Sequence, residues 1–335
     1  MSSNLEKASP QEPGMRMKVN MREFGTLFVL IGVCIILSIL NGKTFLSAGN
    51  IENVAKQVTM NALLAAGMSI VLLIGGIDLS VGSNAAICGV VTAMLLVNGV
   101  NVGMSIFIGV ILGAFIGLIN GLIITKMKIP FFIVTLSTMV ITRGIGFLIT
   151  GGLPVAYFPD SFQAIGKGHF LGVPISVVIV IFIYIVFFIV LNYTKFGRYI
   201  YAIGGNEEAV RLSGISTNVY KTFAYVLSGV MASMAGIVLA SRLNSGQPTA
   251  CDGWEMDAIA AVVIGGTKLS GGEGKIQMTL VGALILGVLS NGLNIMKVSS
   301  YWQFVLKGLV ILIAVGFSIT DWGARKKKKI ELKSV

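Results

Sequence analysis

Few residues of this 335-residue chain are of types that carry covalent chemistry. The sole histidine, His169, stands alone in a polar stretch, and we interpret it as a plain surface residue. The paired carboxylates Glu207 and Glu208 are adjacent, so on a helix their side chains would point in different directions. The three cysteines, Cys34, Cys88 and Cys251, have neither a metal-ligand spacing nor a disulfide framework. The sequence therefore predicts no catalytic residue, no metal site and no cofactor.

A glycine-rich stretch imitates a nucleotide-binding signature. Residues 269–273 read LSGGE, and Gly274-Lys275 follows. A phosphate-binding loop needs the pattern G-x-x-x-x-G-K-[ST], but Leu269 stands five residues before Gly274 and Ile276 follows the lysine. We interpret the stretch as a turn between two apolar segments and expect ATP hydrolysis to belong to a separate subunit.

Polar residues inside long apolar stretches are the other candidates for chemistry. Such residues are costly in lipid, so each is a functional candidate by default. Their amide and hydroxyl groups could hydrogen-bond a neutral hydroxylated solute, although amide bonds that only join helices are commoner. The candidates for a translocation pathway are Asn61, Asp78, Ser80, Asn120, Arg143 and Asn291. Two interpretations of Arg143 stay open: it lines or braces a water-filled path, or its side chain snorkels to water. For Lys307 we favour snorkelling to water.

Ten apolar stretches surround these residues and must position them. Hydrophobic residues make up 55% of the chain and charged ones 12%, and the mean hydropathy is +0.89. A helix needs about 20 mostly apolar residues to cross the hydrocarbon layer. Predicted spans are 24–40, 54–76, 84–99, 102–125, 130–150, 171–192, 219–240, 254–270, 276–296 and 302–320. The eighth has only a short apolar part, so we expect a broken or partly inserted helix there. The fold class is all-α, a polytopic transmembrane bundle.

Basic residues give an orientation to this bundle. With the N-terminus inside, eighteen Lys and Arg residues fall on the cytoplasmic side and five on the other. The tails 1–23 and 321–335 and the polar segment 193–218 are then cytoplasmic, and 24–320 is the membrane domain. The net charge of +11 mainly reflects this bias, and no nucleic-acid partner is expected.

An internal similarity predicts an inverted repeat. Gly113–Leu122 and Gly282–Leu293 resemble each other but run in opposite directions through the membrane, which would relate spans two to five to spans seven to ten. A competing match, GGIDLS at Gly75 and GGTKLS at Gly265, joins segments of the same direction. Glycines 109, 113, 117 and 121 form a packing face, within one copy or between two.

The polar segment 193–218 has a helical interpretation of its own. Gly204-Gly205 would be a flexible entry, Asn206 an N-cap, Glu207 and Glu208 the first turn, and Gly214 the stop. Ala209, Val210, Leu212 and Ile215 would supply an apolar face. So short a helix must dock on its own bundle or on a cytoplasmic partner, because it is not stable alone.

Five blocks together resemble the ribose-type sugar permeases of bacterial ABC importers. They are GGIDLSVGS at 75–83, FIVTLSTMVITRG at 132–144, GRYIYAIGGNEEAVRLSGI at 197–215, SGQPTACDGWEMDAIAAVVIGGTKLSGGEGKI at 245–276 and SSYWQFVLKGLVILIAV at 299–315. The resemblance covers about residues 24–320. One departure is Cys251-Asp252, in a predicted exterior loop where relatives usually show glycine.

This resemblance implies partners. It implies a bacterial inner-membrane subunit that pairs, usually with itself, with an ABC ATPase docked on the cytoplasmic side and an extracytoplasmic sugar-binding protein outside. The segment Gly205 to Ile215 resembles the helix that couples to the ATPase, which gives the coupling residues Gly205, Asn206, Glu207, Glu208, Arg211, Leu212, Gly214 and Ile215.

The sugar stays open. Ribose is the first choice, and galactose, xylose, arabinose and autoinducer-2 are family alternatives. An ion-coupled secondary transporter is the competing class, but it usually needs a membrane-embedded carboxylate, and Asp78, Asp257 and Asp321 fall near predicted span ends. A scaffold or receptor without transport would not need polar, glycine-rich spans.

Overall fold

The computed structural model describes residues 21–319, which form twelve helices and two small strand pairs. The tails 1–20 and 320–335, and the end of the tenth predicted span, lie outside the described residues. The helices are α1 (Met21–Phe45), α2 (Ala48–Leu73), α3 (Val81–Val97), α4 (Val102–Lys126), α5 (Phe131–Thr150), α6 (Asp160–Lys167), α7 (Ile175–Tyr193), α8 (Lys195–Leu212), α9 (Thr217–Leu243), α10 (Trp254–Ile264), α11 (Ile276–Ile295) and α12 (Ser300–Ile319). The predicted all-α class is confirmed.

Seven of these helices are long and apolar enough to cross a membrane: α1 from Gly25, α2, α4, α5, α7, α9 and α11. The shorter α3 is also apolar. Each of the ten predicted stretches contains a helix, but the number of spans stays a prediction.

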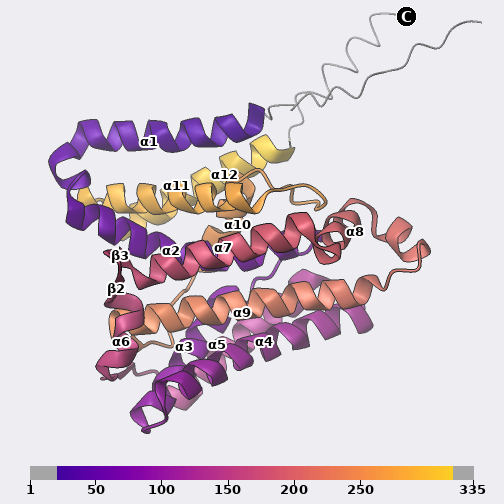
Figure 1. Ribbon diagram of the computed structural model, residues 1–335, viewed down its shortest axis with the longest axis horizontal. Coiled ribbons are helices and arrows are strands. Elements are labelled where there is room, and N and C mark those ends of the chain that lie inside the picture. The colour runs from indigo at the N-terminus through magenta and orange to yellow at the C-terminus, as the bar shows by residue number, and fades with distance from the viewer. Residues whose placement is uncertain (1–20, 320–335) are drawn as a thin grey trace, which may run out of the picture.

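The centre of the bundle is formed by α2 and α9. Figure 1 shows α9 running through the middle, with α4 and α5 on one side and α2 and α7 on the other. Helices α2, α3 and α4 all contact α9, and α10 and α11 contact α2. The core residues of α2, among them Leu63, Leu64, Met68 and Leu72, are fully buried.

Close contact between α4 and α9 depends on the glycines of α4. A Cβ atom on Gly113 would lie 2.5 Å from the carbonyl oxygen of Gly229, and one on Gly121 would lie 2.7 Å from the Cα of Thr222. Such distances leave no room for a side chain. The glycine face of α4 therefore packs within one copy of the chain, which decides the alternative that the sequence left open.

Small elements cap the end of the bundle opposite α8 (Figure 1). Strand β1 (Val155–Ala156) pairs antiparallel with β4 (Ser245–Gly246), with Val155 opposite Gly246. Strands β2 (His169–Phe170) and β3 (Val173–Pro174) form a hairpin. Helix α6 packs on α9, where the Ser241 hydroxyl donates to the carbonyl of Phe162 at 2.6 Å.

The eighth predicted span is broken, as its short apolar part suggested. After α9 the chain is mostly irregular through Gly253, and α10 has only 11 residues. This irregular segment lies against α3. A Cβ atom on Gly246 would be 2.6 Å from the Cβ of Ala93, and one on Gly82 would be 2.5 Å from the carbonyl oxygen of Cys251. Gly246 also lies against Gly89 and Val90, which are about 10 to 12 Å along α3 from Gly82, so residues 246–251 descend along α3 by about that distance.

Candidate functional site

Helix α8 consists of two parts that meet at Asn206. The backbone of Asn206 is not helical (φ −162°, ψ 94°), and its Oδ1 accepts a hydrogen bond from the backbone N–H of Ala209 at 3.0 Å. This is the geometry of an N-cap. Gly214 follows the end of the helix at Leu212 with a φ of +81°, a conformation that glycine adopts without strain. The predicted cap and stop are both confirmed.

The first part of α8 is fixed to the bundle. Ile200 and Ile203 are buried, and the Tyr201 hydroxyl donates to the carbonyl of Gly274 at 2.9 Å. A Cβ atom on Gly204 would lie 2.4 Å from the backbone nitrogen of Gly272, which itself donates to the carbonyl of Leu73 at 2.9 Å. This part of α8 therefore contacts the end of α2 and the glycine-rich turn 265–275 directly.

The second part of α8 is exposed on one side. Val210 is buried and Ile215 is half-buried against the bundle, whereas the Leu212 side chain is 77% exposed. Gly205, Asn206, Glu208, Ala209, Arg211 and Gly214 are exposed as well. The predicted apolar face thus divides, with Val210 and Ile215 holding the helix while Leu212 remains unpacked.

Charges near this exposed part are paired. Glu207 accepts from Lys221 at 2.9 Å and from the Thr217 hydroxyl at 3.1 Å. The Arg211 guanidinium hydrogen-bonds Glu208 at 2.6 Å and 3.0 Å, and this bond lowers the pKa of the Glu208 carboxyl. Both Glu208 and Arg211 are well exposed, so the pair adds little stability.

A groove of about 1030 Å³ lies beside the second part of α8. It separates Glu207, Glu208 and Arg211 from the turn between α4 and α5, where Lys128 has a left-handed backbone (φ 55°). Basic and acidic side chains both line it. Arg211, the sequence neighbour of the exposed Leu212, lines this groove, which a partner could occupy.

Three pathway candidates, Asp78, Ser80 and Asn120, form one buried network inside the bundle. The Asp78 carboxylate accepts from the Ser80 hydroxyl at 2.6 Å, from the Ser80 N–H at 3.0 Å and from the Ser228 hydroxyl at 2.8 Å. The Asn120 amide donates to the Ser80 oxygen at 3.0 Å. Asp78, Ser80 and Asn120 are at most 1% exposed. A buried carboxylate is thus satisfied by neutral donors.

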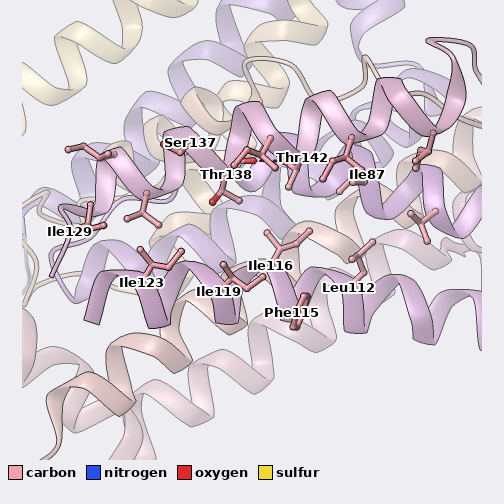
Figure 2. Close-up of a pocket in the computed structure, with 16 residues that line it drawn as sticks. Ile87, Leu112, Phe115, Ile116, Ile119, Ile123, Ile129, Ser137, Thr138 and Thr142 are labelled. Atoms are coloured by element: carbon pink, nitrogen blue, oxygen red, sulfur yellow. Dashed lines mark hydrogen bonds between the residues drawn. The ribbon is translucent and has the colours of Figure 1, made fainter. Parts of the chain in front are cut away.

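This network reaches an open groove. The Thr138 hydroxyl donates to Asn120 Oδ1 at 2.6 Å, and Thr142 donates to Ser83 at 2.8 Å. Thr138, Thr142 and Ser137 are the hydroxyl residues in a groove of about 620 Å³ between α4 and α5, which is otherwise lined by apolar side chains, mostly isoleucines. Figure 2 shows these hydroxyl residues on α5 above the apolar side chains of α4.

The other candidates lie apart from this network. Asn291 and Asn50 exchange two hydrogen bonds, at 2.9 Å and 3.1 Å, which join α11 to α2. Asn61 is half-buried in α2, and its Oδ1 has no hydrogen-bond partner among residues 21–319. The Arg143 Nη1 donates to the carbonyls of Pro248 and Ala250 at 2.7 Å and 2.6 Å. Arg143 therefore braces the irregular segment before α10.

Two expectations for single residues need correction, and a third is confirmed with an added contact. Lys307 does not snorkel, because its Nζ pairs with Asp257 Oδ2 at 2.6 Å. His169 is exposed, as expected, and its Nε2 contacts Glu52 Oε1 at 3.0 Å, which ties the hairpin to α2. Cys251 does not stand in an open loop but is 4% exposed against α3. In each case the partner is far away in the sequence, so local patterns could not reveal it.

Sequence reasoning also missed several members of the buried network. Ser83, Thr138, Thr142 and Ser228 are common residues of helical spans, and their hydroxyls can be satisfied within their own helix. Tyr225 was missed too, and its buried hydroxyl, which lies close to Gly76, has no partner in the part of the chain that the structure describes. The sequence pattern that could have revealed the network is a polar residue on each of several neighbouring spans.

The fold and these polar groups indicate the class of protein. Apolar helices of membrane length, a buried polar network and one exposed polar helix describe a multi-pass membrane protein of the transporter type. The chain belongs to the family described as "Branched-chain amino acid transport system / permease component", which it matches over residues 50–315. It is a permease, a transport component.

Its relatives include sugar permeases. The chain is 48% identical to "Ribose import permease protein RbsC" of Bacillus subtilis over 297 residues, 88% of this chain and 92% of the relative. It is 46% identical to the protein of the same name in Escherichia coli K12, over 86% and 90% of the two chains. It is 38% identical to "L-arabinose transport system permease protein AraH" of that strain, over 88% and 92%. No solved structure matches.

Proposed function

We propose that this chain is the membrane subunit of an ABC importer for ribose, forms the solute pathway as a homodimer, and couples to a separate ATPase. The observation that carries the proposal is the 48% identity to a ribose import permease over 88% of the chain. The arabinose permease is 38% identical, which favours ribose over arabinose. Galactose, xylose and autoinducer-2 remain alternative solutes.

The ATPase would dock at the second part of α8. Support comes from the exposed Leu212, from the Asn206 cap that ends the first part, and from the contact of the first part with α2 and the turn 265–275. A helix fixed at one end and exposed at the other can transmit a displacement into the bundle. The extracytoplasmic sugar-binding protein would dock at the opposite end, around α6 and the β2–β3 hairpin.

We also infer that the bundle contains an inverted repeat. If α2–α5 correspond to α9–α12, then the packing of α4 on α9 should recur as α11 on α2, and both contacts exist. Likewise α3 contacts α4, α5 and α9, while α10 contacts α11, α12 and α2. This correspondence of contacts favours the inverted repeat over the competing GGIDLS and GGTKLS match, which would align α2 with α10.

We also propose an orientation of the bundle in the membrane. Both termini and residues 193–218 would be cytoplasmic. Figure 1 shows α1 beginning and α12 ending towards the side of the bundle where α8 lies, as this orientation requires.

ATP-driven uptake tests the function. Proteoliposomes that contain the permease and its ATPase should take up labelled ribose only with ATP inside and sugar-loaded binding protein outside. The permease alone should hydrolyse no ATP. Excess unlabelled ribose should compete better than arabinose, galactose or xylose. Uptake without ATP that a proton or sodium ionophore abolishes would instead identify a secondary transporter.

A further inference from the structure

Arg143 lies on α5 inward of the end of that helix, and Asp252 lies beside it. Cys251 contacts α3 at Gly82, which is 15 residues, or about 22 Å, from the end of α3 at Val97. On α5, Arg143 lies about 18 Å from Phe131 and about 10 Å from Thr150. The hydrocarbon layer is about 30 Å thick. Asp252, whose carboxylate lies 3.9 Å from Arg143, is therefore placed about 10 Å inside the end of α5 at Thr150.

At this depth the Asp252 side chain is 90% exposed on a single copy of the chain. A carboxylate that faced lipid there would be costly, so charged groups at such depth face water or another protein surface. Its neighbour Arg143 is largely buried, with 17% of its side chain exposed. The two residues thus mark a surface that faces water or another protein copy rather than lipid.

The geometry leaves both charges with unused hydrogen-bonding capacity. Arg143 Nη1 is held by the carbonyls of Pro248 and Ala250, which directs Nη2 towards Asp252. The Nη2–Oδ1 distance is 3.9 Å, longer than the 2.7–2.9 Å of a charge-assisted hydrogen bond. A hydroxyl group beside the pair could accept from the guanidinium and donate to the carboxylate.

The backbone presents Asp252 at this position. Cys251 and Gly253 on either side both have left-handed backbones, with φ of 56° and 76°. Cys251 is buried, so its side chain anchors the segment while Asp252 points away from the bundle. The left-handed backbones of Cys251 and Gly253 thus hold the Asp252 carboxylate in this position. Uncommon backbone conformations of this kind cluster at functional sites.

We propose that Asp252 and the Nη2 of Arg143 form a binding point for a neutral polyhydroxylated solute on its way through the membrane. This inference rests on the proposed function, since it assigns the pathway to this face of the bundle. The carboxylate accepts from two neighbouring hydroxyls of the solute, and the guanidinium donates to one of them. Arg143 also positions the segment 246–253, whereas Asp252 makes only the solute contact.

Water access tests the location. Asp252→Cys is placed in a background with Cys34→Ser, Cys88→Ser and Cys251→Gly, the last because glycine tolerates the left-handed backbone. The complex with ATPase and binding protein is treated with a small, permanently charged methanethiosulfonate. We expect labelling at Asp252→Cys. The matched control is Phe182→Cys, 67% exposed in the middle of the apolar helix α7 beside the exposed Ile181 and Ile185, which should face lipid and not react. An unlabelled Asp252→Cys overturns the proposal.

Transport kinetics test the contact. Asp252→Ala should lower the maximal ribose uptake rate about tenfold, the effect of losing a hydrogen bond to a charged group. The half-saturating concentration of loaded binding protein should stay unchanged, because delivery precedes this contact. Thermal stability should also be unchanged, since the side chain is exposed. Uptake by Asp252→Ala within twofold of the unsubstituted chain overturns the solute contact alone. Absent ribose uptake by the unsubstituted chain contradicts the proposed function instead.

Discussion

Charged side chains inside this bundle are satisfied in three different ways. Asp78 receives hydroxyl and backbone donors, Arg143 donates to backbone carbonyls, and Lys307 and Asp257 form an ion pair between α12 and α10. Only the last arrangement joins two opposite charges on separate helices. Each side chain of that pair is at most 25% exposed, so removing one partner leaves the other poorly solvated.

The Lys307 and Asp257 pair gives a prediction at the residue scale. Lys307→Met should lower the apparent Tm of the purified permease in lipid nanodiscs, because it leaves the Asp257 carboxylate unpaired. A loss at or below the roughly 3–5 kcal/mol of fully buried pairs is expected. The double variant Lys307→Met with Asp257→Leu should recover much of the loss. Additive losses in the double variant would mean that the two side chains do not depend on each other.

Helix α8 is the element whose two parts have different roles. The part before Asn206 is buried on α2 and the turn 265–275, and the part after it carries one unpacked apolar side chain, Leu212. A single exposed apolar side chain is common on protein surfaces, so Leu212 supports docking only together with the groove beside Arg211. Glu207 already forms an ion pair with Lys221, so a substitution of Glu207 would also disturb the bundle. A substitution of Leu212 therefore tests docking more directly.

Leu212→Asp should uncouple the ATPase while the permease still folds and inserts. A charge in an apolar contact with the partner is costly, but an exposed aspartate costs the free permease little. We expect weaker co-purification of the ATPase subunit and loss of ribose uptake. Ser213→Asp, which adds the same charge one residue later at an exposed position, should retain both. Normal uptake by Leu212→Asp would show that this part of α8 is only a solvated segment.

The whole molecule has two distinct ends. Figure 1 shows α8 at one end and α6 with the β2–β3 hairpin at the other. Between them the helices pack through glycine contacts and buried side chains. If α8 is cytoplasmic, the hairpin must face outside.

Single cysteines can test this orientation in intact cells. In a cysteine-free background, Leu171→Cys, 89% exposed at the hairpin, should react with an impermeant thiol reagent. Asn206→Cys should be shielded until the membrane is permeabilised. Cysteines at Ser2 and Ser334 should behave like Asn206→Cys. Reaction of Asn206→Cys from outside would reverse the proposed topology.

The sequence by itself determined the helical class, the break in the eighth span, and the cap and stop of the second part of α8. These features depend on hydropathy and on the local preferences of Asn206 and Gly214. Only the tertiary structure decided which partners satisfy Asp78, Arg143 and Lys307, because those partners lie 50 to 150 residues away along the chain, apart from Ser80. It also decided the depth of Asp252, which follows from the descent of residues 246–251 along α3. Hydropathy records that a residue is polar, but its depth and its partners depend on how the helices pack.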